Sequence, residues 1–194
     1  MAQFSISYRK TAGHEGGYSN HPSDRGGETY RGIARNRWQS WEGWEIVDRL
    51  RKESDFPANL EIDPDLSGLV VKFYHDNFWV QIMGDSIPTQ GISDELYDTS
   101  VNMGTGQAIK FLQQSLNVLN RNQRDYMDVK PDGKIGQQTL GALSAYLGGK
   151  GNTEELLLKV MNLYQGCRYL DIMADPSQEV FARGWLNRVD IIKT

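Results

Sequence analysis

The sequence predicts a mainly α-helical protein with a small loop or β element near residues 16–32. Two observations lead to this fold class. Apolar residues recur at helical spacing along most of the chain, whereas the early segment 16–32 is dense in Gly, Asn, Asp, Ser and Pro, the residues of turns and hairpins. With 194 residues, of which 39% are hydrophobic, the chain is long enough to bury a core.

Helices are expected in sequence along the chain. The first covers residues 4–14 and ends at a glycine pair, because glycine ends helices at little steric cost. After the polar segment, helical patterns cover residues 33–41, 44–53, 63–82, 93–104, 106–121, 131–147, 153–173 and 178–189. Two of them have helix-start signals, since Asp63 and Pro64 open one and Thr153, followed by acidic residues, precedes another.

The charge and hydropathy of the chain exclude some partners. The formal net charge is -4 and the pI about 5.4, whereas general nucleic-acid binding requires a surplus or cluster of Lys and Arg. No stretch approaches the roughly 18 consecutive apolar residues of a membrane helix. Residues 1–13 lack the apolar core of a secretory signal. We therefore expect no nucleic-acid or membrane partner, no signal peptide, and synthesis in the cytoplasm.

Cysteine and histidine usage argues against a metal centre. The single cysteine, Cys167, cannot form an internal disulfide and is expected to be a small buried side chain. The three histidines show none of the paired spacings of metal ligands. Neither a metal nor any other cofactor is expected.

The polar segment carries residues suited to glycoside hydrolysis. Glu15 is expected at the end of the first helix, and Asp24, Glu28 and Thr29 follow it. The reaction requires a protonated carboxylic acid at the leaving oxygen and usually a second carboxylate. The negative end of the helix dipole, together with partial desolvation, would raise the pKa of Glu15 as a general acid requires. By composition alone, an ordinary helix-end carboxylate and an Asx-turn are the commoner explanations.

The order of residues in this segment adds a family resemblance. The relevant residues are Glu15-Gly16-Gly17-Tyr18, Asn20, Pro22, Asp24, Gly26-Gly27-Glu28-Thr29 and Gly32-Ile33. This run resembles the signature of the glycoside hydrolase family 108 N-acetylmuramidases, which implies a lysozyme-like fold. In that family the Glu of the E-G-G-Y motif is the catalytic acid, which implies that role for Glu15. The spacing also resembles the Glu, Asp and Thr arrangement of phage-type lysozymes, so Asp24 and Thr29 are expected to support water or charge.

The resemblance extends over most of the chain. Residues 129–143 resemble the predicted peptidoglycan-binding region attached to this family, although a plain tight turn leading into a helix explains them equally well. We therefore expect a lysozyme-like catalytic region over residues 1–95 and a helical peptidoglycan-binding region over residues 96–194, packed as one compact unit.

Candidate substrate-binding residues follow from the way that sugar rings bind, against aromatic faces with polar groups nearby. The candidates are Tyr18, Tyr30, Trp79, Tyr97 and Asn102. Asn102 is expected either to hydrogen-bond the substrate or to cap the helix break at Gly104. Three further tryptophans, Trp38, Trp41 and Trp44, fit core positions better, and Glu28 fits a surface carboxylate better than a catalytic one.

The resemblance implies a peptidoglycan hydrolase that cleaves the β-1,4 bond between N-acetylmuramic acid and N-acetylglucosamine, with Glu15 as general acid. Two alternatives stay open. A lytic transglycosylase would use the same Glu and let the muramyl 6-hydroxyl attack, and a non-catalytic secretion-helper protein would bind the wall without cutting it. The expected partner is bacterial peptidoglycan, reached by a monomer after release through a holin or another exporter.

Overall fold

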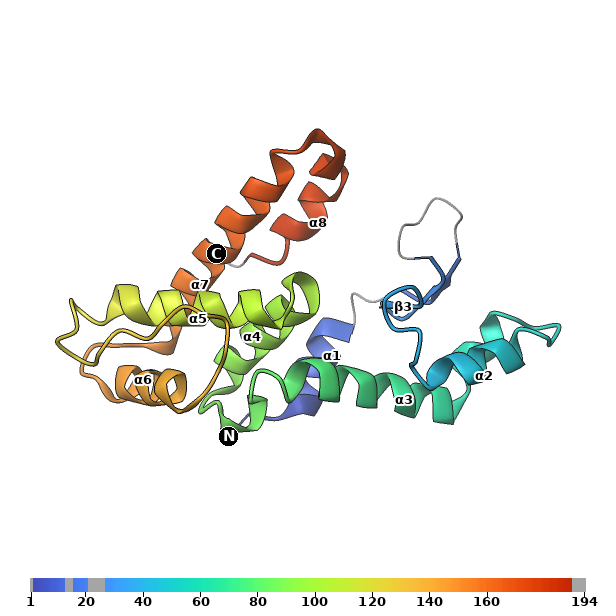
Figure 1. The fold of residues 1–194 in the computed structure, drawn as a ribbon, viewed down its shortest axis with the longest axis horizontal. Coiled ribbons are helices and arrows are strands. Elements are labelled where there is room, and N and C mark those ends of the chain that lie inside the picture. The colour runs from blue at the N-terminus through green and yellow to red at the C-terminus, as the bar shows by residue number, and fades with distance from the viewer. Residues whose placement is uncertain (1, 13–15, 21–26, 190–194) are drawn as a thin grey trace. The chain divides into compact units, whose positions relative to one another are not determined.

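The computed structural model describes residues 2–12, 16–20 and 27–189 (Figure 1). Over these residues the fold is mainly helical with one small three-stranded antiparallel sheet, which confirms the predicted fold class. The chain divides into two compact units, one of residues 8–77 and one of residues 1–7 and 78–194. The expected functional division after residue 95 falls within a helix and stays a prediction.

Helices lie at all but one of the expected positions, but three have different bounds. The α-helix expected over 63–82 ends at Tyr74, the one over 131–147 begins at Gln137, and the one over 178–189 covers only residues 182–186. The helices are α1 (Phe4–Ala12), α2 (Gly43–Leu50), α3 (Pro64–Tyr74), α4 (Gln90–Met103), α5 (Thr105–Leu119), α6 (Gln137–Gly148), α7 (Glu154–Met173) and α8 (Ala182–Leu186). Shorter helical turns are η1 (Ala58–Glu61), η2 (His75–Trp79), η3 (Gly84–Ser86) and η4 (Pro176–Phe181). Both predicted start signals are confirmed, since the side chains of Asp63 and Thr153 accept hydrogen bonds from the first turns of α3 and α7.

The small sheet lies where the polar segment predicted a loop or β element. Its strands are β1 (Tyr18–Ser19), β2 (Thr29–Tyr30) and β3 (Ile33–Ala34), and β2 pairs with both neighbours. The turn between β2 and β3 has two residues, Arg31 with φ of 42° and Gly32 with φ of 77°. Positive φ at both positions is the geometry of a tight β-hairpin, and glycine adopts it without steric cost.

The prediction of a helix over residues 33–41 is wrong. Ile33 and Ala34 form β3, and turns continue from there to α2. The hairpin brings Ile33 opposite Tyr30, and both side chains are fully buried. Tertiary burial at a strand position thus overrides the helical spacing of the apolar residues.

Aromatic packing and one buried hydrogen bond hold the unit of residues 8–77 together. The hydroxyl of Tyr30 donates to the main-chain oxygen of Leu60 at 3.0 Å, which ties β2 to η1. Trp38 packs edge to face on Phe73 with ring centroids 4.8 Å apart. Trp44 is buried, as expected of a core position, whereas Trp38 and Trp41 are half-buried. Trp41 contacts both Trp44 and Phe73.

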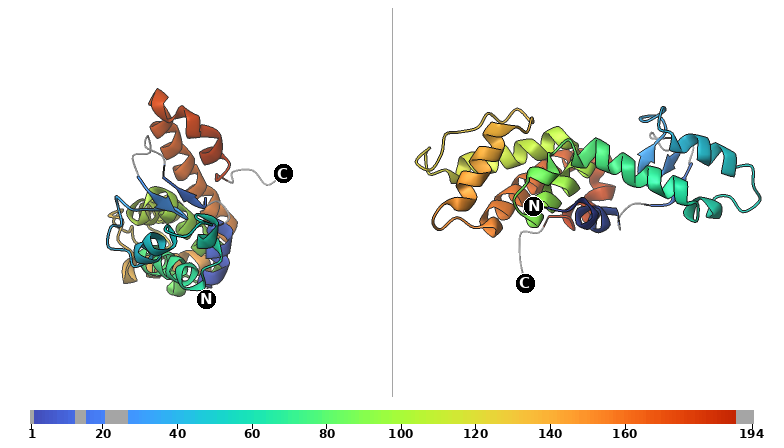
Figure 2. Two further views of the ribbon diagram at one scale, coloured as in Figure 1. Left: turned by 90° about the vertical axis from the view of Figure 1, so that its right-hand side faces the viewer. Right: turned by 90° about the horizontal axis from the view of Figure 1, so that it is seen from below.

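The other unit is built on three helices that lie side by side, α4, α5 and α7, as Figures 1 and 2 show. α6 packs on α5, and α8 packs with η4 against α7. A buried hydrogen bond of 3.1 Å from Gln165 to Thr99 joins α7 to α4. Cys167 is exposed on α7, so its predicted burial is wrong.

Neither a membrane span nor a metal site is found among the described residues. No helix among them is long and apolar enough to cross a membrane. Within the same part of the chain, no three His, Cys, Asp or Glu side chains gather as metal ligands would.

Candidate active site

A cavity of about 220 Å³ lies in the unit of residues 8–77, beside the E-G-G-Y motif. Its wall is formed by Tyr8, Gly16, Gly17, Arg31, Glu61, Val70 and Tyr74. Gly16 and Gly17 are the two residues that follow Glu15 in the sequence. Glu15 and Asp24 themselves lie outside the described residues. The main chain therefore enters the cavity wall one residue after the predicted acid.

The hairpin turn at Arg31 organises this wall. The main-chain N–H of Arg31 donates to the oxygen of Gly17 at 3.2 Å, and its main-chain oxygen accepts a hydrogen bond of 2.8 Å from the Tyr74 hydroxyl. The Arg31 guanidinium pairs with the carboxylate of Glu61 at 2.5 Å. This hydrogen bond to Glu61 raises the pKa of Arg31, so the arginine is charged at any working pH.

Glu61 is a site residue that sequence reasoning missed. It ends η1, and a side-chain carbon on Gly17 would come within 3.4 Å of its Oε1 atom. The cavity thus contains the Glu61 carboxylate beside Gly17, which follows Glu15 by two positions in the sequence. Nothing in the local sequence around Glu61 distinguishes it from a surface glutamate, because its neighbours at the cavity come from distant parts of the chain.

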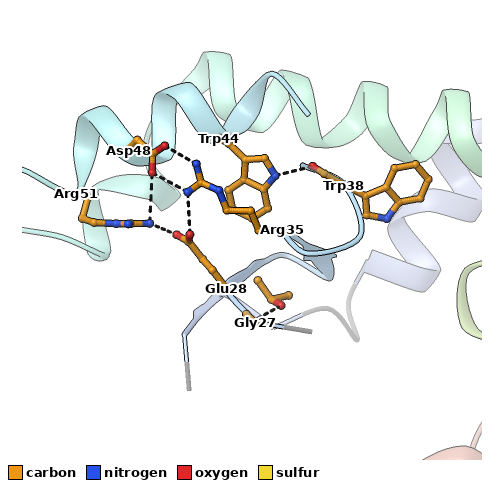
Figure 3. Close-up of polar contacts among 8 residues, drawn as sticks. Gly27, Glu28, Arg35, Trp38, Trp44, Asp48 and Arg51 are labelled. Atoms are coloured by element: carbon orange, nitrogen blue, oxygen red, sulfur yellow. Dashed lines mark hydrogen bonds and ion pairs between the residues drawn. The ribbon is translucent and has the colours of Figure 1, made fainter. Parts of the chain in front are cut away.

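Glu28 is a structural brace between the sheet and α2 (Figure 3). Its carboxylate accepts hydrogen bonds from Arg35, at 2.8 Å, and from Arg51, and Arg35 also binds Asp48 at 2.7 Å. The Arg35 guanidinium lies 5.0 Å from the ring centre of Trp44, a cation–π contact.

The protonation of Glu28 follows from these contacts. Burial acts to raise its pKa, but the hydrogen bonds from Arg35 and Arg51 outweigh burial and lower the pKa below the usual value. Glu28 is therefore an anion at neutral pH, unsuited to donate a proton. Its side chain is only 10% exposed, so the expectation of a surface carboxylate is wrong.

Thr29 is the one predicted catalytic residue that the structure describes. It is half-buried on β2, and its hydroxyl donates to the main-chain oxygen of Gly27 at 3.2 Å. Its lone pairs remain able to accept a hydrogen bond. Its role in supporting water or charge stays a prediction.

Tyr18 has the exposure expected of a cleft residue. Its half-buried ring on β1 packs edge to face on Phe56 with centroids 4.7 Å apart. Burial, followed by the negative charge of Glu28, raises the pKa of its hydroxyl, so Tyr18 is neutral at physiological pH.

Three predicted substrate-binding aromatics lie in the core instead. Tyr30, Trp79 and Tyr97 are each 0% exposed. Trp79 donates its indole N–H to Asp85 at 2.9 Å, and the ring of Tyr97 packs against Phe4. A fully buried ring offers no face to a sugar, so these residues are assigned to packing and not to a cleft.

Asn102, the fifth candidate, lies in the other unit. It is exposed on α4, and its amide donates to the main-chain oxygen of Asp98 at 2.7 Å and to the Asp98 carboxylate at 3.2 Å. The side chain therefore binds one turn back along its own helix, not at the break at Gly104. Contact with substrate stays a prediction.

Comparison with known proteins identifies the class of enzyme. The family model of glycosyl hydrolase 108 matches residues 8–104, half of the chain, and the chain belongs to this family. A second model, described as a predicted peptidoglycan domain, matches residues 107–190. Together they define a glycosyl hydrolase that acts on peptidoglycan. No curated protein matches the chain.

One similar solved structure is that of SagA from Brucella abortus. Its sequence is 25% identical, and the superposition has a TM-score of 0.64. The match covers 96% of this chain and 89% of the SagA chain. The likeness therefore extends over both matched regions and supports the same fold throughout.

Proposed function

We propose that the chain is an N-acetylmuramidase, which hydrolyses the β-1,4 bond between N-acetylmuramic acid and N-acetylglucosamine with Glu15 as the general acid. The observation that carries this proposal is the cavity whose wall includes Gly16 and Gly17, directly after Glu15. Membership of the glycosyl hydrolase 108 family supplies the reaction class.

The chemistry requires one acid and a source of negative charge. The protonated Glu15 donates to the glycosidic oxygen as the bond breaks, and the sugar ring acquires positive charge. Asp24 and Thr29 are proposed to support the attacking water or this charge. Glu61 is a further carboxylate in the same cavity, held in place by Arg31, and we assign it to stabilising the positive charge on the sugar.

The products of wall digestion test this reaction. Purified peptidoglycan is digested with the wild-type chain, and the soluble fragments are analysed by mass spectrometry before and after borohydride reduction. A muramidase releases fragments with reducing muramic acid ends. Fragments lighter by one water and resistant to reduction indicate a lytic transglycosylase, and protein that sediments with the wall without releasing fragments indicates a binding protein. Either result contradicts the proposal.

We also propose that the protein acts at the cell wall as a monomer after leaving the cytoplasm through a holin or another exporter. The support is the location of the substrate, which lies outside the cytoplasmic membrane. Fractionation of the producing cells tests the route. Protein found only in the cytosol of intact cells, with no release during lysis, would contradict this route.

A further inference from the structure

A second cavity, of about 260 Å³, lies in the unit of residues 1–7 and 78–194. Its wall combines Gln113 of α5 with residues of the segment 129–139, which leads into α6. The cavity falls inside the region that matches the predicted peptidoglycan domain. The proposed catalytic chemistry does not use it.

A buried glutamine fixes the shape of this cavity. Gln113 is 1% exposed, and its amide nitrogen donates to the Asp132 carboxylate at 3.2 Å, the Lys134 main-chain oxygen at 3.0 Å and the Thr139 hydroxyl at 3.2 Å. Its side-chain oxygen accepts from the N–H of Gly133 at 3.0 Å. One side chain thus holds four positions of the segment and makes the wall a rigid frame.

The glycine in this segment is required by close packing. Gly133 has φ of 74°, and a side-chain carbon there would come within 2.6 Å of the main-chain oxygen of Gly106. The segment therefore lies directly against the start of α5.

The charge of the cavity wall is positive although the chain is acidic. Lys130 and Lys134 are exposed at the wall, and Asp132 is the one carboxylate among its lining residues. The Asp132 oxygen already accepts hydrogen bonds from the Lys134 N–H, at 2.9 Å, and from Gln113. The two lysines outnumber the single carboxylate of Asp132, so the wall has an excess of one positive charge. The remaining lining groups are amides, a hydroxyl and aliphatic side chains.

We propose that this cavity binds a carboxylate of the peptide stems of peptidoglycan, with the ammonium groups of Lys130 and Lys134 as its ionic partners. The stems of this polymer carry free carboxylates and amide groups, which match lysine cations beside glutamine side chains. The inference rests on peptidoglycan being the substrate and does not depend on which residue cleaves the glycan. The cavity then retains the enzyme on the wall while the other unit cuts.

Titration with a soluble stem peptide tests this site. The full chain is titrated with the tripeptide L-alanyl-γ-D-glutamyl-meso-diaminopimelate, and binding is followed by calorimetry. We expect saturable binding that salt weakens, and about tenfold or greater loss of affinity in Lys130→Gln/Lys134→Gln. The matched control, Lys110→Gln/Lys159→Gln, removes the same charge from exposed lysines of the same unit and should bind as the wild type does.

The remaining arms identify the group that is bound. The same tripeptide with amidated carboxyl groups should not bind. Equal affinity of the two double variants, or binding of amidase-stripped glycan fragments but not of the tripeptide, overturns the proposal. Fragment release from whole peptidoglycan is measured separately. Because the titration requires no bond cleavage, failure of this site and failure of the muramidase assignment give different results.

Discussion

The guanidinium of Arg31 lies 2.5 Å from the carboxylate of Glu61, in the cavity whose wall includes Gly16 and Gly17. Arg31 occupies the turn of a hairpin and Glu61 ends a short helix thirty residues later, so the pair connects the two elements. It also places a carboxylate beside the main chain that leads to the predicted acid. The role proposed for the Glu61 carboxylate, stabilising positive charge on the sugar, can be tested by substitution.

Replacing Glu61 by glutamine keeps its size and removes its charge. We expect turnover of purified peptidoglycan to fall by about 10²-fold with little change in KM, because charge stabilisation acts mainly in the transition state. The matched control is Glu53→Gln, an exposed glutamate of the same unit, which should be active. Full turnover by Glu61→Gln, with an unchanged melting temperature, would show that the carboxylate has no part in the reaction.

The Glu28 brace predicts acid sensitivity. The pKa of Glu28 is lowered in the folded state, so its contribution to stability is complete above its unfolded pKa of about 4.3 and is lost as the pH falls through the folded value. Glu28→Gln should cost about 1–3 kcal/mol of unfolding free energy at pH 7 and flatten the decline in stability below pH 5. Urea denaturation at several pH values measures both effects. An identical pH dependence in wild type and variant would contradict the brace.

Two glycine substitutions should act in opposite directions. Gly32→Ala forces a side chain onto a residue with φ of 77° and should cost about 1–2 kcal/mol. Gly68→Ala changes an exposed position within α3, where nothing lies within 4 Å, and should stabilise by up to about 1 kcal/mol. Urea midpoints of the two variants decide the matter, and a stabilised Gly32→Ala would rule out the described hairpin turn.

A substitution at Tyr30 distinguishes a packing role from a substrate-binding role. Tyr30→Phe removes the hydrogen bond to Leu60 and should cost about 1 kcal/mol, without changing KM for peptidoglycan. Tyr18→Phe offers the comparison at a half-buried tyrosine of the neighbouring strand. A raised KM in Tyr30→Phe, at unchanged stability, would restore this residue to the cleft.

The structure could be predicted from the sequence where neighbouring residues determine it. Asp63 and Thr153 opened helices as their side chains predicted, and the polar segment contained the first two strands of the sheet. Prediction failed where residues distant in the sequence determine the local structure. The apolar spacing of residues 33–41 fits a helix, and only the pairing of Ile33 with Tyr30 shows that a strand forms there.

The candidate site divides in the same way. The motif at Glu15 could be found because its residues are adjacent in the sequence. Trp79 and Tyr97 could not be distinguished from cleft aromatics, because an aromatic residue has the same sequence signal whether it is buried or exposed. Glu61 was missed because its place in the cavity depends on a hairpin thirty residues before it.

The role of Glu15 is tested most directly by the rate at which reducing ends are released from purified peptidoglycan. The variant is Glu15→Gln, the matched control is Glu53→Gln, and circular dichroism establishes that both are folded. We expect the control to match the wild type and Glu15→Gln to lose activity by about 10²–10⁴-fold, the contribution of a general acid. A folded Glu15→Gln variant that releases reducing ends at the wild-type rate would contradict the assignment of Glu15 as the acid.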